Sequence, residues 1–256
     1  MVMSKVSPSA KIPLKQFLGG KGSFNQRLDY AKKLNYDFYK QVCPEIKKGM
    51  ISPITYRKLL KNLLPDNIKL HITKLPQSII EKGIFGRTIP LGNNINGFTI
   101  SLPYEEKYGN KNKNGMISLK NFSTMMHENF HLFVEAANPK FSARCSFEDE
   151  QGYEVFNQNL YGPAVGRFGL GKMFKIMQYL KTKPLEDRIN FLQLARYHLY
   201  EEHYAYIEGA NYSNSMYNNV PFNFKPQIAF LEMLLYANIQ KARKQNELNL
   251  LKSENE

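Results

Sequence analysis

The chain has 256 residues, of which 43% are hydrophobic, enough apolar material for one large domain or two small ones. Its formal net charge of +13 favours anionic partners or an acidic substrate. The basic residues are scattered and no nucleic-acid-binding motif accompanies them. A solvated basic surface is therefore a better interpretation than a specific nucleic-acid site.

Cysteine content and hydropathy indicate the compartment in which the protein is expected. The two cysteines, Cys43 and Cys145, are too few for a disulfide framework, so a reducing compartment is the simpler expectation. Residues 1–20 lack the apolar core of a secretory signal, and no apolar run reaches the roughly 18 residues that a membrane span needs. We therefore expect no signal-peptide secretion and no membrane contact. The expected location is the cytoplasm, or a virion if the source is viral.

The first quarter of the chain is predicted to form an arm followed by two helices. Residues 1–22 carry Ser, Pro, Lys and Gly without periodicity and predict a flexible basic arm. Apolar residues at helical spacing predict a helix over 24–42, which Pro44 is expected to end. Ser52 and the proline after it predict a second helix that begins there and runs to about residue 64.

The next stretch changes to the period of a strand. Apolar and polar residues alternate over 68–72 and again over 98–102, where Pro103 stops the pattern. Residues 84–89 are a further short strand candidate. Residues 67–103 together predict a small antiparallel sheet.

The remainder of the chain is predicted to be helical. The fold class is therefore α+β, mainly helical, with a single domain over residues 23–252. Its parts are a helical segment 23–66, a sheet and one helix over 67–140, and a helical segment 141–252. The first helix expected after the sheet ends near residue 137. Four further helices are expected over residues 147–159, 174–180, 185–209 and 226–251.

His127-Glu128-Asn129-Phe130-His131 is the most informative stretch of the chain, because it has the form H-E-x-x-H within a predicted helix. Residues i and i+4 share one helix face, so both imidazoles can reach one metal ion with Glu128 beside them. Zn²⁺ suits two imidazoles and leaves a position for water, whose proton the glutamate can accept. The alternative is a helix that packs these side chains without a metal.

Two histidines need a third protein ligand to hold zinc. A third histidine six residues after His131 is absent, because that position is alanine. The predicted helix 185–209 offers Glu202, which shares a helix face with small and apolar residues. A carboxylate buried on such a face is costly unless it is paired or binds a metal. We therefore expect Glu202 to be the third ligand, with Glu201 as the runner-up.

The H-E-x-x-H stretch followed by Leu199-x-x-Glu202-x-x-Ala205-Tyr206 resembles the gluzincin-type zinc metallopeptidases. The resemblance covers mainly residues 97–140 and 185–210. The second stretch lacks the N-E-x-x-S-D pattern of the thermolysin-like members, so no subfamily can be assigned.

The resemblance implies a zincin-like fold and a role for each motif residue. Zinc would be bound by His127, His131 and Glu202, and Glu128 would be the general base. The edge strand on which zincins align a substrate would be residues 97–102.

Several polar residues near the expected centre have two interpretations each. His198, one turn before Glu202, can support a ligand or an oxyanion, or it can be a core histidine. Tyr206 can support the tetrahedral intermediate, although tyrosine is common in this chain. The neighbouring carboxylates Glu135, Glu201 and Glu208 are expected in solvent.

Two functional hypotheses remain open at this stage. The first is a zinc metalloendopeptidase that acts on protein or peptide substrates with Glu128 as base. The second is a structural or assembly protein with a zincin-like fold, such as a phage ring or tail-adaptor component, active or not. A homo-oligomer or a larger assembly fits either hypothesis. The metal itself stays open, because histidine and carboxylate ligands accept several divalent ions.

Overall fold

The computed structural model contains two compact units. The first comprises Met1–Ser142 and Tyr204–Asn219, and the second comprises Ala143–His203 and Val220–Glu256. The arm predicted for residues 1–22 lies outside the described residues, and the single-domain organisation stays a prediction. The residues that the structure describes are 24–46, 48–82, 84–91, 97–105, 115–119, 122–137, 150–161, 168–212 and 224–253.

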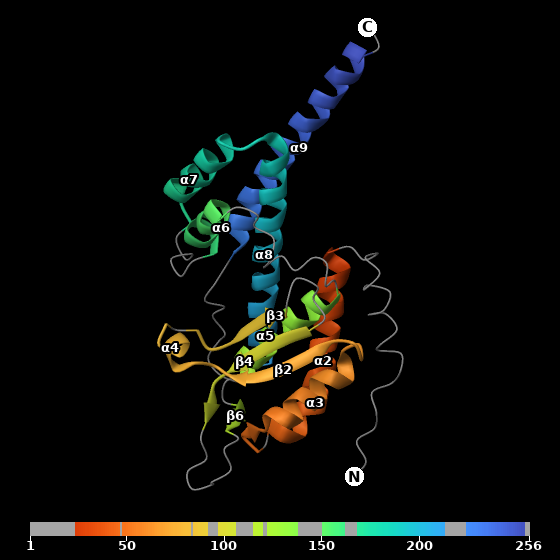
Figure 1. Cartoon of the computed structure of the whole chain (residues 1–256), viewed down its shortest axis with the longest axis vertical. Coiled ribbons are helices and arrows are strands. Elements are labelled where there is room, and N and C mark those ends of the chain that lie inside the picture. The colour runs from red at the N-terminus through yellow and green to blue at the C-terminus, as the bar shows by residue number, and fades with distance from the viewer. Residues whose placement is uncertain are drawn as a thin grey trace. The chain divides into compact units, whose positions relative to one another are not determined.

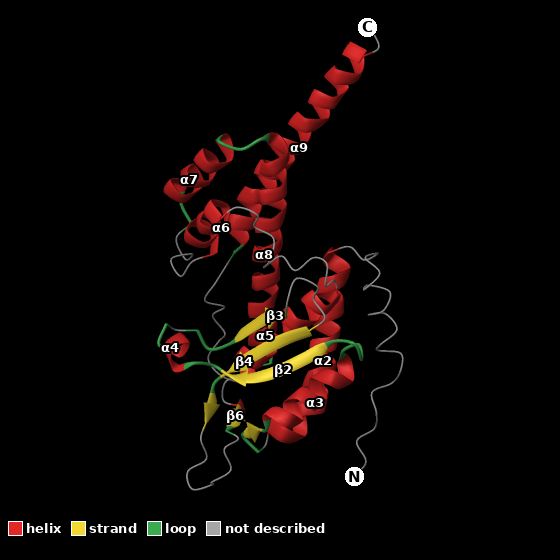
Figure 2. Cartoon of the chain, in the orientation of Figure 1, coloured by secondary structure: helices red, strands yellow, loops and turns green. Residues whose placement is uncertain are grey.

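The fold is mainly helical with small sheets, as the sequence predicts (Figures 1 and 2). Helix α8 runs from Leu185 to Asn211, and its residues from Tyr204 onward belong to the first unit. No helix in the described part of the chain is both long enough and apolar enough to cross a membrane. The other helices of the first unit are α2 (Phe24–Ile46), α3 (Pro53–Leu63), α4 (Gln77–Ile80) and α5 (Phe122–Ala137).

Two three-stranded sheets are present among the described residues of the first unit. One has the order β2-β4-β3 and the other the order β1-β6-β5. The strands are β1 (Met50–Ile51), β2 (Lys69–Lys74), β3 (Arg87–Pro90), β4 (Gly97–Leu102), β5 (Tyr104–Glu105) and β6 (Met116–Ser118).

The sheet β2-β4-β3 corrects two sequence predictions. It is mixed and not antiparallel, because β4 pairs in parallel with β2 and antiparallel with β3. Strand β4, expected at the edge, is therefore the central strand, and β3 is an edge. The chain between β2 and β4 contains α4 and β3, long enough for the crossover that parallel pairing requires. Alternation along a single strand carries no information about its neighbours' directions.

Aromatic packing fixes α5 in the core of the first unit. Phe38, Tyr56, Phe98, Phe130 and Phe133 are among the largest fully buried side chains. The rings of Phe38 and Tyr56 meet edge to face with their centroids 5.7 Å apart. Burial of a side chain of this size stabilises the fold by roughly 1.5–3 kcal/mol. Phe130 and Phe133 therefore anchor the helix that carries the H-E-x-x-H stretch.

The helix α3 begins where its capping residues predict. Ser52 accepts a hydrogen bond from the main-chain N–H of Thr55 at 3.0 Å, and Pro53 takes the first helical position. These contacts satisfy one N–H that the helix cannot bond itself and place the proline where no N–H is needed. The predicted start is confirmed.

The predicted end of α2 at Pro44 is wrong, because the helix continues to Ile46. A proline inside a helix costs about 3 kcal/mol or more. Here the helix passes Pro44 by only two residues, so the missing main-chain N–H lies in its last turn. The chain turns back after the helix at Gly49, whose φ of +71° favours glycine.

The regular elements among the described residues of the second unit are all helical. The observed α7 and the start of α6 differ from the predicted bounds by a few residues, and α6 continues as a π-helical turn, Asn157–Tyr161. The rings of Phe156, Tyr161 and Phe224 stack in sequence, with centroid separations of 6.0 and 6.2 Å. The helices are α6 (Glu150–Phe156), α7 (Leu170–Lys181), the first part of α8 and α9 (Lys225–Ser253).

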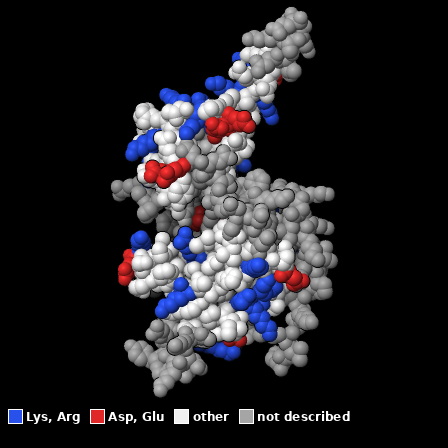
Figure 3. All heavy atoms as spheres, viewed as in Figure 1, with Lys and Arg blue, Asp and Glu red and all other residues white. Residues whose placement is uncertain are grey.

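Basic side chains are spread over both units. On the face shown in Figure 3, Lys and Arg form several separate groups with neutral surface between them. This distribution agrees with the scattered pattern in the sequence.

Glu208 makes the stability of the first unit depend on pH. Burial raises the pKa of this carboxyl, although Asn35 and Lys32 act in the opposite direction. A raised pKa means that the folded chain holds the proton more tightly, so stability falls as the pH rises above about 4.3, the usual unfolded value. Glu208→Gln cannot ionise and should be more stable, relative to wild type, at pH 7 than at pH 5. Denaturant unfolding of both metal-free proteins measures this difference, and a pH-independent difference would contradict the assignment.

Candidate metal centre

Helix α5 is unusual in being buried on almost every side. Of its 16 residues, 13 are buried, including Glu128, Asn129, His131 and Glu135. A helix that is apolar around its circumference belongs in a core. The polar residues of the H-E-x-x-H stretch therefore lie in an environment of low dielectric, where their interactions are strong and an uncompensated charge is costly.

His127, His131 and Glu202 form a group that can hold a metal ion. One ligand atom from each residue lies within 4.8 Å of the other two. The Nε2 atoms of His127 and His131 are 3.1 Å apart, and their rings meet at 73°. Tetrahedral zinc with bonds near 2.1 Å separates its ligand atoms by about 3.4 Å. Two imidazoles and a carboxylate thus suit a divalent ion such as zinc in kind, and the most distant pair of atoms would have to move closer to reach tetrahedral spacing.

A close crossing with α5 sets the position of α8. A Cβ atom on Gly209 would lie 2.7 Å from the carbonyl oxygen of Ser123 and 3.4 Å from Cβ of His127. The ring of Tyr206 packs edge-on against His127, with a centroid separation of 4.5 Å. Since α8 is continuous, Glu202 lies one helical turn before Tyr206 on the same face.

Asn35 of α2 connects the two helices that carry the ligands. Its Nδ2 donates to the main-chain oxygen of Met126 at 3.1 Å and to Oε2 of Glu208 at 3.4 Å. Asn35 is fully buried, so both bonds are protected from water. The bonds connect α2, α5 and the end of α8 beside the candidate centre.

Glu128 is held by the edge strand β3 and is not one of the three grouped ligands. The hydroxyl of Thr88 donates to its Oε2 at 2.7 Å and to its main-chain oxygen at 3.0 Å. Thr88 is fully buried and Glu128 nearly so. A Cβ atom on Gly86 would lie only 2.7 Å from both Cγ and Oε1 of Glu128. Strand β3 and the residue before it thus form the wall against which this carboxylate rests.

Asn129, inside the H-E-x-x-H stretch, has a structural contact of its own. The hydroxyl of Tyr56 donates to Asn129 Oδ1 at 2.5 Å. Burial, and then the charge of Glu128, raise the pKa of Tyr56 well above its ordinary value. Tyr56 therefore stays a neutral donor and ties α3 to α5.

The three expected ligands come together, while the neighbouring glutamates were placed wrongly. Glu135, Glu201 and Glu208 were expected in solvent, but their exposed fractions are 3%, 3% and 5%. The helical wheel assigns one buried face, whereas a helix packed on several sides buries residues all around it. His198 packs against Phe156 at a centroid separation of 5.3 Å, and its role in a reaction stays a prediction.

Thr88 and Gly86 are the residues at the site that sequence reasoning missed. They lie in or beside a short predicted strand and belong to no motif. Only the packing of β3 on α5 brings them to Glu128, so no local pattern could have identified them.

Comparison with protein-family models, curated proteins and solved structures finds no match to this chain. The resemblance to gluzincins therefore rests on the motif residues alone. The structure adds a possible metal-binding group made from those same residues.

Gly209→Ala should weaken zinc binding and lower the free energy of unfolding by roughly 1–3 kcal/mol, because its methyl group collides with the main-chain oxygen of Ser123. Competition with a chromophoric chelator gives the affinity, and denaturant unfolding gives the stability. Gly171→Ala in α7 is the matched control, since nothing lies within 4 Å of its Cβ position. Unchanged zinc affinity in Gly209→Ala would contradict the proposed control of Glu202 by this crossing.

Proposed function

We propose that this chain is a zinc-dependent peptidase in which His127, His131 and Glu202 bind the metal and Glu128 is the general base. One observation carries the proposal: three suitable ligand atoms converge within 4.8 Å beside a buried glutamate. Three protein ligands leave a fourth position for water or substrate, as catalytic zinc sites require.

The reaction would be hydrolysis of a peptide bond by water. Bound zinc would supply Lewis-acid polarisation of the substrate carbonyl and acidification of the attacking water. Glu128 would accept the proton from that water and deliver it to the leaving nitrogen. Tyr206 would keep the ring of His127 in its ligating orientation through their edge-on contact.

The substrate would align along β3. This strand is an edge of its sheet, and its residue Thr88 contacts Glu128 directly. An extended peptide that pairs with the outer edge of β3 would place its backbone beside the general base. The absence of a side chain at Gly86 would allow Glu128 to rest against this end of the strand.

Zinc content and peptide cleavage, measured together, test the proposal. Wild type should contain about one zinc per chain and cleave a mixture-based fluorogenic peptide library. Glu202→Ala should lose the zinc. Glu128→Gln should keep the zinc and lose at least about 100-fold in rate, because the base is removed and the ligands remain.

The outcomes separate the two functional hypotheses. Zinc in wild type, with no cleavage above the Glu128→Gln background, would favour a structural zinc site in an assembly protein. Absence of zinc from wild type after incubation with the metal would overturn the metal site and the peptidase together.

Thr88→Val should lower kcat by about 10- to 100-fold with little change in KM or zinc content, because it removes the hydroxyl that holds Glu128 and keeps the side-chain shape. Thr88→Ser retains the hydroxyl and should restore most of the rate. Steady-state kinetics with one cleaved library peptide measures both variants. Equal losses in the valine and serine variants would mean that Thr88 acts only through packing.

A further inference from the structure

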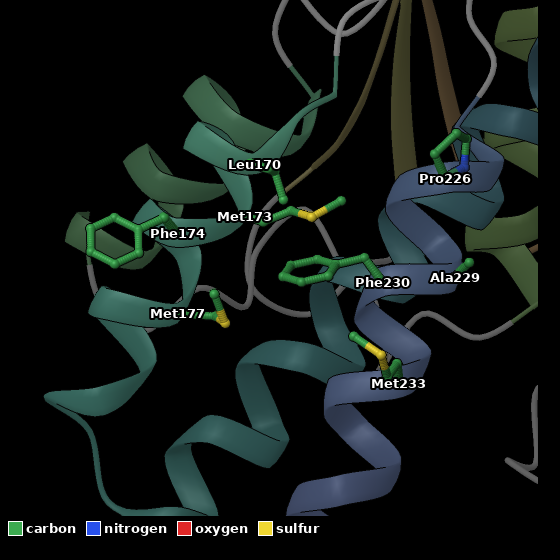
Figure 4. Close-up of a pocket in the computed structure, with 8 residues that line it drawn as sticks. All are labelled: Leu170, Met173, Phe174, Met177, Pro226, Ala229, Phe230 and Met233. Carbon is green, nitrogen blue, oxygen red and sulfur yellow. The ribbon is translucent and has the colours of Figure 1, made fainter.

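The second unit has an open apolar groove between α7 and α9 (Figure 4). Large side chains along it are exposed to solvent: Leu170 by 84%, Phe174 by 54% and Met233 by 60%. Its lining includes Leu170, Met173, Phe174 and Met177 from α7 and Phe230 and Met233 from α9.

Each of these helices has an apolar stripe beyond the one that the core of the unit uses. In α7 the inward residues Ile176, Tyr179 and Leu180 are buried. In α9 the buried residues include Leu231 and Leu235. A helix that is apolar on two sides is usually covered on both. Large exposed apolar patches mark interaction surfaces, so we expect the groove to bind a partner.

The shape of the groove suits the binding of one helix. Leu170, Met173, Phe174 and Met177 follow i, i+3, i+4, i+7 spacing over about 10 Å, and α9 forms the opposite wall. An amphipathic helix fits such a hollow with anchors at the same spacing. The methionines can adjust their shape to different anchors. A membrane surface would instead take the outward face of a single helix.

The lysines near the groove favour the binding of an acidic partner. Lys181 follows Met177 by one turn on the groove face of α7, which contains no acidic residue. On α9, Lys241 and Lys244 are exposed on the face that also carries Met233. The carboxylate of Glu232 is engaged by Tyr200 at 2.9 Å and Arg196 at 3.7 Å. A second copy of the chain would bring the same basic residues, so like charges would oppose self-association.

We propose that this groove binds an acidic amphipathic helix of a partner protein. Its apolar anchors would occupy the space between Phe174 and Met233. Its carboxylates would pair with Lys181, one turn beyond Met177, and with Lys241, about two turns beyond Met233.

A display library of 18-residue helical peptides tests the proposal on the full chain. Apolar residues are fixed at i, i+3, i+4 and i+7, and Glu, Gln or Lys is randomised at the remaining positions. Selection on wild type should enrich Glu. Selection on the charge-reversed variant Lys181→Glu/Lys241→Glu should enrich Lys instead.

The apolar wall is tested with the variant Phe174→Ser/Met233→Ser, which should bind the selected peptides at least about 10-fold more weakly in fluorescence anisotropy. Both side chains are exposed, so the helices should keep their circular dichroism. Tyr153→Ser in α6 is the matched control, because Tyr153 is 51% exposed and is not among the groove residues. It should bind like wild type.

Three results would overturn the proposal. The first is a library in which no peptide is enriched over the Phe174→Ser/Met233→Ser background, or in which Glu is not favoured. The second is a dimer in light scattering that this double variant abolishes, which would make a second copy the occupant. The third is groove-dependent binding to phosphatidylserine vesicles, which would make the surface a membrane contact.

Discussion

The close crossing of α5 and α8 at Gly209 is the contact on which the candidate metal centre depends. Without a side chain at this position, the two backbones approach until the carbonyl oxygen of Ser123 occupies the space of a Cβ atom. Tyr206 can then pack on His127, and Glu202 lies one turn further back along the same face. The absence of a Cβ atom at Gly209 therefore allows ligands from distant parts of the chain to come together.

Burying carboxylates is the main electrostatic cost of this arrangement. Glu208 and Glu202, both on α8, have different groups beside them that offset this cost. Burial raises the pKa of Glu208, and Asn35 partly offsets the effect by donating a hydrogen bond. Glu202 lies instead beside two imidazoles, where a divalent cation would compensate its charge. The same helix thus holds one carboxyl that an amide stabilises and another that is grouped with two imidazoles as a possible metal ligand.

The sequence predicted what local patterns encode. The H-E-x-x-H stretch and the cap at Ser52 follow from residue spacing along one element, and spacing also pointed to Glu202, which the structure groups with His127 and His131. The central position of β4 and the contact of Thr88 with Glu128 depend on elements far apart in the chain. No periodicity within one strand reports on these contacts, so only the packed fold could reveal them.

The number of protein ligands is what separates the two proposed roles of the group. Structural zinc sites are closed by four protein ligands, whereas catalytic sites keep one position open. The group found among the described residues has three members. Glu128, next to His127 in sequence, is bonded to Thr88 on the edge strand and rests against Gly86. Under the proposed function, the hydroxyl of Thr88 would hold Glu128 in place as the general base.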